Sequence, residues 1–238
     1  MASHALSDTR YEAKKADLTT YFDSTAAAQW EALTSDAPVG RIRATVRAGR
    51  DRMRALLLSL LPDELTGTSL LDAGCGTGAL AIEAAQRGAA VTAIDVSPRL
   101  IEVAHDRALK AGVANRIEYL AGDMLDPELG EFTHAIFMDS LIHYERDDIV
   151  AALARLAPRI ERSILFTIAP RTRLLAAMHA AGQLFPRGNR SPALSPIAPD
   201  RLAQAIARTP QLGDWRQGHC ERVASGFYAS QMQELVRR

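Results

Sequence analysis

The sequence predicts an α/β fold in which helices cover a mostly parallel, doubly wound sheet of the Rossmann-like type. Strand-like apolar runs alternate with helix-like segments from about residue 66 to residue 169. A glycine-rich turn follows the first of these runs, and acidic residues end the next ones. Because open α/β sheets bind ligands outside the carboxyl ends of their strands, we expect the functional site there.

The composition limits the classes of protein to which the chain can belong. Its 238 residues fit one such domain with additions, and 47% hydrophobic and 24% charged residues are typical of a soluble globular protein. The formal net charge of zero argues against nucleic acid as a partner. Two cysteines argue against a disulfide framework, and no apolar run approaches the ~20 residues that span a bilayer. We therefore expect a cytoplasmic protein that is at most peripheral to a membrane.

The first predicted strand, at residues 69–71, leads into the turn Asp-Ala-Gly-Cys-Gly-Thr-Gly at 72–78 and then a helix. Dinucleotide-binding turns prefer G-x-G-x-x-G, whereas the spacing here is G-x-G-x-G. An acid before the turn would repel a pyrophosphate and would suit an ammonium or a sulfonium. The turn resembles the first motif of the class I S-adenosylmethionine (SAM) methyltransferases. We therefore expect it to bind SAM through Asp72, Gly74, Cys75, Gly76 and Gly78.

The second predicted strand, at residues 90–95, ends in an acid about twenty residues past the glycines, where a doubly wound fold places a carboxylate on the ribose hydroxyls. Ser97 and Pro98 then predict the start of a helix, because serine caps helices and proline fits their first turn. We assign Asp95 and its neighbour Val96 to the cofactor site.

The third and fourth predicted strands add further candidates. The third, at residues 117–124, ends in Gly-Asp-Met, where an acid resembles the one that binds the adenine amino group in class I methyltransferases. We assign Asp123 to that group and Met124 to the ring face. The fourth, at 135–140, ends in Asp139 and Ser140, which we add to the cofactor site.

The segment after the fifth predicted strand, residues 163–169, suggests a substrate pocket. Residues 174–185 are apolar on nearly all sides, and arginines stand before and after them at 171, 187 and 190. An apolar wall beside guanidinium groups would suit a large flat ligand with acidic side arms. The alternative is a core helix followed by a solvent-exposed loop.

The N-terminal 62 residues read as helical. Tyr21 and Thr25 lie four apart on one helical face and are candidates for the cofactor side, whereas Phe22 and Trp30 read as core contacts. Arginines at 43, 47, 50 and 54 form one stripe of a helix. We expect this stripe to be a solvated face; the alternatives are an anionic substrate, an acidic partner or anionic lipid.

Several segments together resemble the magnesium-protoporphyrin IX O-methyltransferase family of (bacterio)chlorophyll biosynthesis. The resembling segments are residues 21–25 with Trp30, 41–54, 71–78, 138–144, 166–171, 184–190 and 225–230. The resemblance implies a seven-stranded sheet with an N-terminal helical cap at 1–62 and a SAM-binding core at 63–170. It also implies a substrate-covering insertion at 171–198 and a C-terminal helix and hairpin at 199–238.

The resemblance implies that SAM methylates a propionate carboxylate of magnesium-protoporphyrin IX, giving the monomethyl ester and S-adenosylhomocysteine (SAH). His143 is the expected base or orienting group, with Tyr21 as a second catalytic candidate. The expected substrate-binding residues are His143, Tyr144, Arg171, Arg187 and Arg190. The family's lid tyrosine is replaced by Thr34. We expect no metal held by the protein, since the magnesium arrives in the substrate; a magnesium-chelatase subunit or a photosynthetic membrane are candidate partners.

Two other functions fit the same motifs. A class I methyltransferase for a quinone-pathway phenol or a small carboxylic acid would share every cofactor residue. A protein that binds SAM or a tetrapyrrole without catalysis would also share them. The glycine spacing argues against a nicotinamide-dependent oxidoreductase.

Overall fold

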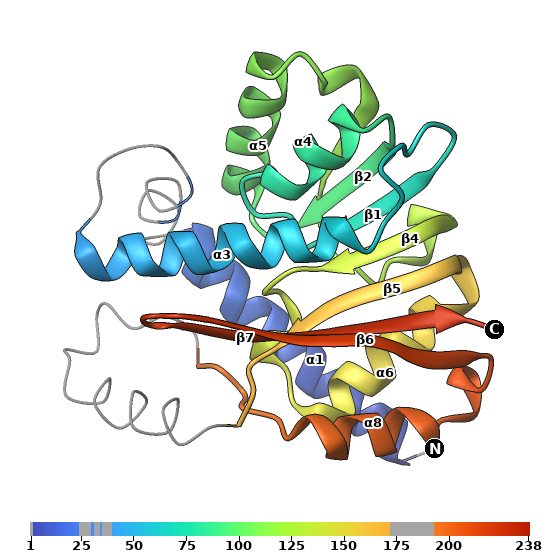
Figure 1. Cartoon of the computed structure of the whole chain (residues 1–238). Helices are drawn as coiled ribbons and strands as arrows, with labels where there is room; N and C mark the ends of the chain where they lie inside the picture. The colour runs from blue at the N-terminus through green and yellow to red at the C-terminus, as the bar shows by residue number, and fades with distance from the viewer. Residues whose placement is uncertain (1, 24–29, 31–33, 35–39, 172–192) are drawn as a thin grey trace.

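The structure of the chain, a computed structural model, describes residues 2–23, 30, 34, 40–171 and 193–238 (Figure 1). Its centre is a seven-stranded sheet in the order β3-β2-β1-β4-β5-β7-β6. The strands are β1 (Ser69–Ala73), β2 (Ala90–Asp95), β3 (Ile117–Ala121), β4 (Phe132–Phe137), β5 (Ile160–Ile168), β6 (Trp215–Ser225) and β7 (Tyr228–Arg237). Strands β1 to β5 are parallel, whereas β7 is antiparallel to both β5 and β6. The predicted seven-stranded Rossmann-like sheet is confirmed.

Helices cover both faces of this sheet (Figure 1). On one face, α1 (Ala2–Tyr21), α6 (Arg146–Leu156) and α8 (Pro199–Ala207) share an apolar cluster. On the other, α3 (Arg41–Ser59), α4 (Ala79–Gln86) and α5 (Pro98–Lys110) share a second. Leu70 belongs to the second cluster and Leu71 to the first, because successive strand side chains point to opposite faces. Short 3-10 turns complete the chain: η2 (Ala114–Arg116), η3 (Pro127–Leu129), η4 (Leu141–His143), η5 (Ala157–Arg159) and η7 (Pro210–Leu212).

The strand ends differ from the predicted ones. Strand β4 begins at Phe132 rather than at residue 135 and stops at Phe137. Asp139 has a left-handed backbone with a φ of 56°, which cannot continue a strand. Strand β3 likewise stops at Ala121, and β5 begins at Ile160 rather than at residue 163. The candidate site residues Asp123, Asp139 and Ser140 therefore lie in the loops that follow β3 and β4, at the edge of the sheet.

Helix α3 carries the arginine stripe, and the structure corrects the expectation of a solvated face for Arg50 and Arg54, whereas Arg43 is exposed. Arg50 forms an ion pair with Asp139, and Arg54 forms one with Glu83. The two arginine side chains are only 17% and 21% exposed. Because α3 packs against β6, β7 and α4, this face meets neighbouring carboxylates instead of water. Ile42, near the start of the helix, is 57% exposed.

Most of the predicted insertion falls at residues 172–192, outside the described residues. Its two described ends meet beside the sheet. Pro170 and Ile197 form an isolated parallel bridge, and the Arg171 N–H donates to the Ile197 carbonyl at 3.0 Å. Among the helices that the structure describes, none combines the length and the apolar character needed to cross a membrane.

Buried His134 on β4 should make stability depend on pH. Its Nδ1 lies 2.6 Å from the Ser163 hydroxyl oxygen on β5, and burial lowers its pKa to about 4. The unfolded imidazole has a pKa of about 6.5, so between pH 6.5 and 4 the unfolded state binds more protons and the free energy of unfolding falls as the pH is lowered. The free energy of unfolding of the parent minus that of the His134→Asn variant, measured by urea denaturation, should fall by up to about 3 kcal/mol across this window. The His134→Asn variant should lose less; an equal loss would contradict the assignment.

Candidate active site

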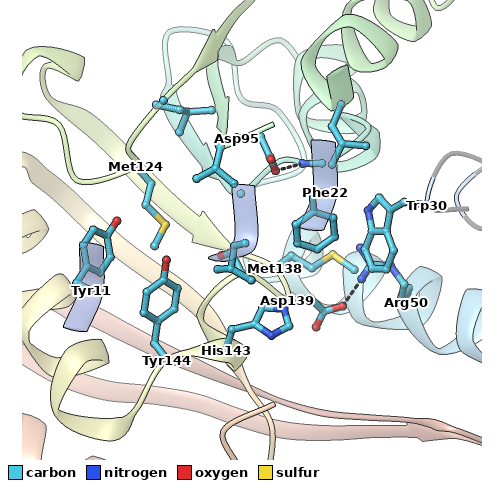
Figure 2. Close-up of a pocket in the computed structure, with 18 residues that line it drawn as sticks. Tyr11, Phe22, Trp30, Arg50, Asp95, Met124, Met138, Asp139, His143 and Tyr144 are labelled. Atoms are coloured by element: carbon cyan, nitrogen blue, oxygen red, sulfur yellow. Dashed lines mark hydrogen bonds and ion pairs between the residues drawn. The ribbon is translucent and has the colours of Figure 1, made fainter. Parts of the chain in front are cut away.

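A pocket, called here the first pocket, opens beside the glycine turn at the carboxyl ends of the parallel strands (Figure 2). It encloses about 660 Å³ including its open mouth, within the range of small-molecule sites. A second pocket of about 820 Å³ lies toward α3 and α4. Four residues line both pockets, so the two meet at Trp30, Arg50, Gly74 and Met138. The other residues of the first pocket are Tyr11, Leu18, Phe22, Gly76, Ile94, Asp95, Val96, Leu100, Gly122, Met124, Asp139, Ser140, His143 and Tyr144.

The glycine turn is packed closely on its outer side. Gly74, Gly76 and Gly78 have φ values of 79°, 55° and 78°, in the left-handed region that favours glycine. A Cβ on Gly74 would lie 2.3 Å from Ser140, and one on Gly76 would lie 3.3 Å from Nε1 of Trp30. Larger residues would therefore push the loop after β4 and the N-terminal segment away from the turn. Gly74 and Gly76 line the first pocket, and the second pocket is lined by Cys75.

Asp72, at the end of β1, is almost fully buried, and its Oδ2 has no hydrogen-bond partner within the described structure. Burial raises the pKa of Asp72 to about 7, and the nearby Asp95 adds to the increase. An unpartnered buried carboxylate oxygen indicates a place for a ligand that donates a hydrogen bond. Arginines also line this second pocket, at 47, 50 and 54. Its charges therefore suit a zwitterion, with an ammonium at one end and a carboxylate at the other.

Asp95 joins the glycine turn to the loop after β2. Its Oδ2 accepts from the Gly76 N–H at 2.9 Å, and its Oδ1 accepts from the Ser97 N–H at 3.0 Å. Burial raises the pKa of Asp95, although these backbone bonds oppose the increase. The carboxylate lines the first pocket beside the apolar side chains of Ile94 and Val96. This wall of the pocket combines one carboxylate with apolar side chains, which suits a nucleoside. The sugar hydroxyls can bind the carboxylate, and the base can pack on the apolar surface.

Asp123 lines neither pocket and instead holds helix α1. Its Oδ1 accepts from the Tyr11 hydroxyl at 2.6 Å and from the Leu125 N–H at 2.9 Å, and its Oδ2 accepts from Lys15 Nζ at 2.8 Å. Burial disfavours the carboxylate, but the bonds from Lys15 and Tyr11 outweigh it and lower the pKa of Asp123. The expected neighbour Met124 does line the first pocket.

Docking at Asp123 makes α1 a wall of the first pocket. Tyr11, Leu18 and Phe22 of the N-terminal segment all line it. The Tyr11 ring stacks on Tyr144, with ring centroids 5.2 Å apart. Figure 2 shows the two rings side by side, below Met124. The N-terminal helix and the loop after β4 are therefore joined across the pocket.

Asp139 accepts hydrogen bonds from four side chains of three elements, α3, β5 and β7. Its Oδ2 accepts from Arg50 Nη1 at 2.6 Å, and its Oδ1 accepts from the hydroxyls of Thr167 and Ser230 at 3.2 Å each. The Tyr228 hydroxyl donates to both oxygens, at 3.1 and 3.2 Å. These bonds leave the expected cofactor residue Asp139 acting mainly as an anchor for the groups around it.

His143 lies in η4 and lines the first pocket between Tyr144 and Asp139 (Figure 2). Its Nδ1 is 3.3 Å from the carbonyl oxygen of Ala193. Since a carbonyl only accepts, Nδ1 carries the proton and Nε2 carries the lone pair. Burial lowers the pKa of His143 despite this bond, so the ring is neutral near pH 7. A neutral imidazole with a free Nε2 can accept a proton or orient a carboxylic acid.

The other predicted site residues lie apart from these. Tyr21 ends α1, packs edge-to-face on Phe22 with ring centroids 5.1 Å apart, and lines neither pocket. Arg171 is exposed and also lines neither pocket. Thr25, Arg187 and Arg190 lie outside the described residues.

Thr34, at the position where the resemblance implies a lid tyrosine, has a structural role. The Thr34 hydroxyl donates to the Trp30 carbonyl at 2.8 Å and accepts from the Thr77 hydroxyl at 2.9 Å. It therefore ties the N-terminal segment to the glycine turn, beside which the Trp30 ring lies.

Sequence reasoning missed part of the site. Tyr11 and Lys15 carry no motif that marks them. Trp30 and Arg50 lie in segments that resemble the family. Their residue types alone, however, indicate only a core contact for the tryptophan and a solvated face for the arginine. Within the part of the chain that the structure describes, no three His, Cys, Asp or Glu side chains gather in a way that could hold a metal ion.

Comparisons with known proteins show the family to which the chain belongs. The family profile "Magnesium-protoporphyrin IX methyltransferase C-terminus" matches residues 137–237, and the profile "Methyltransferase domain" matches 70–161. The magnesium-protoporphyrin O-methyltransferase of Rhodobacter capsulatus is 47% identical over 90% of this chain and 92% of its own length. That of Synechocystis is 30% identical over 70% of this chain and 73% of its own length.

A solved structure shares the whole architecture. The crystal structure of magnesium protoporphyrin IX methyltransferase from Synechocystis PCC 6803 with bound SAH has a TM-score of 0.80 to this chain at 27% identity. The match covers 94% of this chain and 100% of that one.

The bond between Lys15 and Asp123 should stabilise the docked helix. Both side chains are about three-quarters buried, at 24% and 23% exposure, so their ion pair is less screened than a surface pair. Urea denaturation of Lys15→Met, Asp123→Asn and the double variant should give a coupling energy of about 1 kcal/mol. Because the folded pKa of Asp123 is lowered, the coupling should vanish as acid protonates this carboxyl. Lys14→Met serves as control, and zero coupling near pH 7 would contradict the docking role.

Proposed function

This chain belongs to the magnesium-protoporphyrin O-methyltransferase family, and from that premise we propose that it methylates one propionate carboxylate of magnesium-protoporphyrin IX. SAM is the methyl donor, and the products are the monomethyl ester and SAH. One observation carries the proposal: the two pockets meet. The second pocket has the charges that suit a zwitterion, and the first contains the neutral His143. The names of the most similar relatives favour this acceptor over a quinone-pathway phenol.

The described residues fit SAM in both pockets. Asp95 with Ile94, Val96 and Met124 would hold the adenosine part in the first pocket. In the second pocket, the unpartnered Oδ2 of Asp72 would hold the ammonium, and Arg47 and Arg54 would hold the carboxylate. When bound, SAM supplies the electrophilic methyl group.

The chain's own residues supply desolvation, alignment and a proton acceptor. Methyl transfer from a sulfonium to a carboxylate removes both charges, so a pocket that excludes water from the carboxylate favours the reaction. Tyr11, Phe22, Met138 and Tyr144 give the first pocket that apolar surface. The same surface raises the pKa of a propionic acid that enters it. Nε2 of His143 would then accept the acid's proton, while the Ala193 carbonyl holds the ring in place.

The surface for other partners is smaller than the arginine stripe suggested. Arg50 and Arg54 are paired inside the protein. On α3, the arginines exposed to a chelatase subunit or an anionic membrane are Arg41, Arg43 and Arg52. The magnesium enters as part of the porphyrin substrate.

The direct test is to incubate the purified chain with SAM and magnesium-protoporphyrin IX and to measure the monomethyl ester by HPLC with mass detection. Metal-free protoporphyrin runs alongside as a second acceptor. We expect ester formation, with kcat lowered about a hundredfold or more in His143→Ala because its proton acceptor is lost. His219→Ala, which changes an exposed histidine on β6, should behave as the parent. SAH binding without any ester would contradict the proposal.

Cofactor affinity should depend on the ionisation of Asp72. Below a pH of about 7 its carboxyl is protonated in the free protein, and an ammonium ligand favours the carboxylate. The Kd of SAH by calorimetry should therefore rise about tenfold per pH unit as the pH falls below 7, and level off above it. Asp72→Asn should bind weakly at every pH, and Asp106→Asn on α5 should follow the parent. A flat profile in the parent, or an unchanged slope in Asp72→Asn, would contradict this role.

A further inference from the structure

The first pocket has one permanently cationic side chain among its described lining residues, and it is Arg50. The acceptor reacts as a carboxylate anion. His143 is neutral before it accepts a proton, and the carboxylates of Asp95 and Asp139 would repel an anion. Of the arginines expected to bind the substrate, Arg171 lines neither pocket, and Arg187 and Arg190 lie outside the described residues. Arg50 is therefore the described group with the charge to receive the substrate.

The Arg50 guanidinium is held at two points. Its Nη1 donates to Asp139 Oδ2 at 2.6 Å, and its Cζ lies 4.6 Å from the centroid of the Trp30 ring. The side chain is 17% exposed, so the group is largely desolvated but still reaches the pocket space. Since a guanidinium has five N–H donors, the bond to Asp139 leaves donors for a second carboxylate.

The anchor under Arg50 is itself rigid. Asp139 also accepts hydrogen bonds from hydroxyl groups of β5 and β7, which fix the position of its carboxylate at the pocket wall. Tyr228 reaches it by packing on Gly49, where a Cβ would lie 2.5 Å from the ring. The neighbour of Arg50 in sequence is thus a glycine against which the ring of Tyr228 packs.

We propose, on the basis of the function given above, that Arg50 binds and orients the propionate carboxylate that accepts the methyl group. Arg50 lies where the two pockets meet, at the place to which a methyl donor spanning both would bring its sulfonium. Arg47 and Arg54 line the second pocket and not the first, so they lie on the side where the donor's carboxylate is expected. Asp139 balances the charge of Arg50, which lowers its repulsion of a neighbouring sulfonium.

The reaction then weakens the hold of Arg50 on the product. One carboxylate oxygen forms the C–O bond to the methyl group, the C–S bond breaks, and its electron pair stays on sulfur. The ion pair with a carboxylate becomes a hydrogen bond to a neutral ester carbonyl, which lacks the attraction between opposite charges and is weaker. Arg50 therefore binds the substrate more tightly than the ester and favours product release.

The test compares two ligands in the presence of saturating SAH: magnesium-protoporphyrin IX and its dimethyl ester, which has no carboxylate. Fluorescence titration gives the Kd of each for the parent, Arg50→Gln, Arg50→Lys and Arg52→Gln, an exposed arginine of the same helix. Arg50→Gln should weaken binding of the free acid at least about tenfold and leave the dimethyl ester within twofold. Arg50→Lys keeps a charge beside buried Asp139, so its affinity for the free acid should lie between those of the parent and Arg50→Gln. Arg52→Gln should bind both ligands as the parent does.

Three results would overturn the proposal. Equal loss of both ligands in the Arg50 variants would mean a general packing role. A tenfold or greater loss of SAH affinity with unchanged discrimination between acid and ester would assign Arg50 to the cofactor. A parent chain that binds SAH but neither binds nor esterifies the porphyrin would remove the proposed function itself, and it would do so before any variant is compared.

Discussion

The buried carboxylate of Asp139 is the constraint on which the site depends. It stands at a left-handed backbone position that ends β4 and turns the next residues over the sheet edge. A charge in this place must be compensated, because burying an unpaired carboxylate is costly. Arg50 supplies the opposite charge, and hydroxyl groups from β5 and β7 supply the remaining donors. One group thus fixes the position of α3 and of the antiparallel hairpin relative to the parallel strands.

A second carboxylate plays the same part for the N-terminal helix. Asp123 follows β3 and holds α1 through Tyr11 and Lys15, so residues distant in the sequence close the pocket. The two acids differ in what they leave open. Asp123 lines neither pocket, whereas Asp139 holds Arg50, which lines both. The fold therefore uses acids at strand ends both to assemble the pocket and to charge it.

The sequence predicts the parallel half of the fold well because its signals are local. The turn glycines, the capping Ser97 and the apolar strands each act within a few residues, and the structure has them in the predicted places. The partners of Asp123 and Asp139 could not be predicted, since they come from residues 112 and 89 positions away. The solvated face predicted for Arg50 and Arg54 was wrong for the same reason. Periodicity shows which residues share a helical face, but it does not show what packs against that face.

The most direct test of this account is a crystal structure of the chain with SAH and magnesium-protoporphyrin IX. The account predicts the sulfur where Trp30, Arg50, Gly74 and Met138 meet, and one propionate carboxylate within about 3.5 Å of the Arg50 guanidinium. The bond from Arg50 to Asp139 should persist in the complex. A complex with both propionates outside the first pocket, and with Arg50 bound to the carboxylate of SAH, would contradict it.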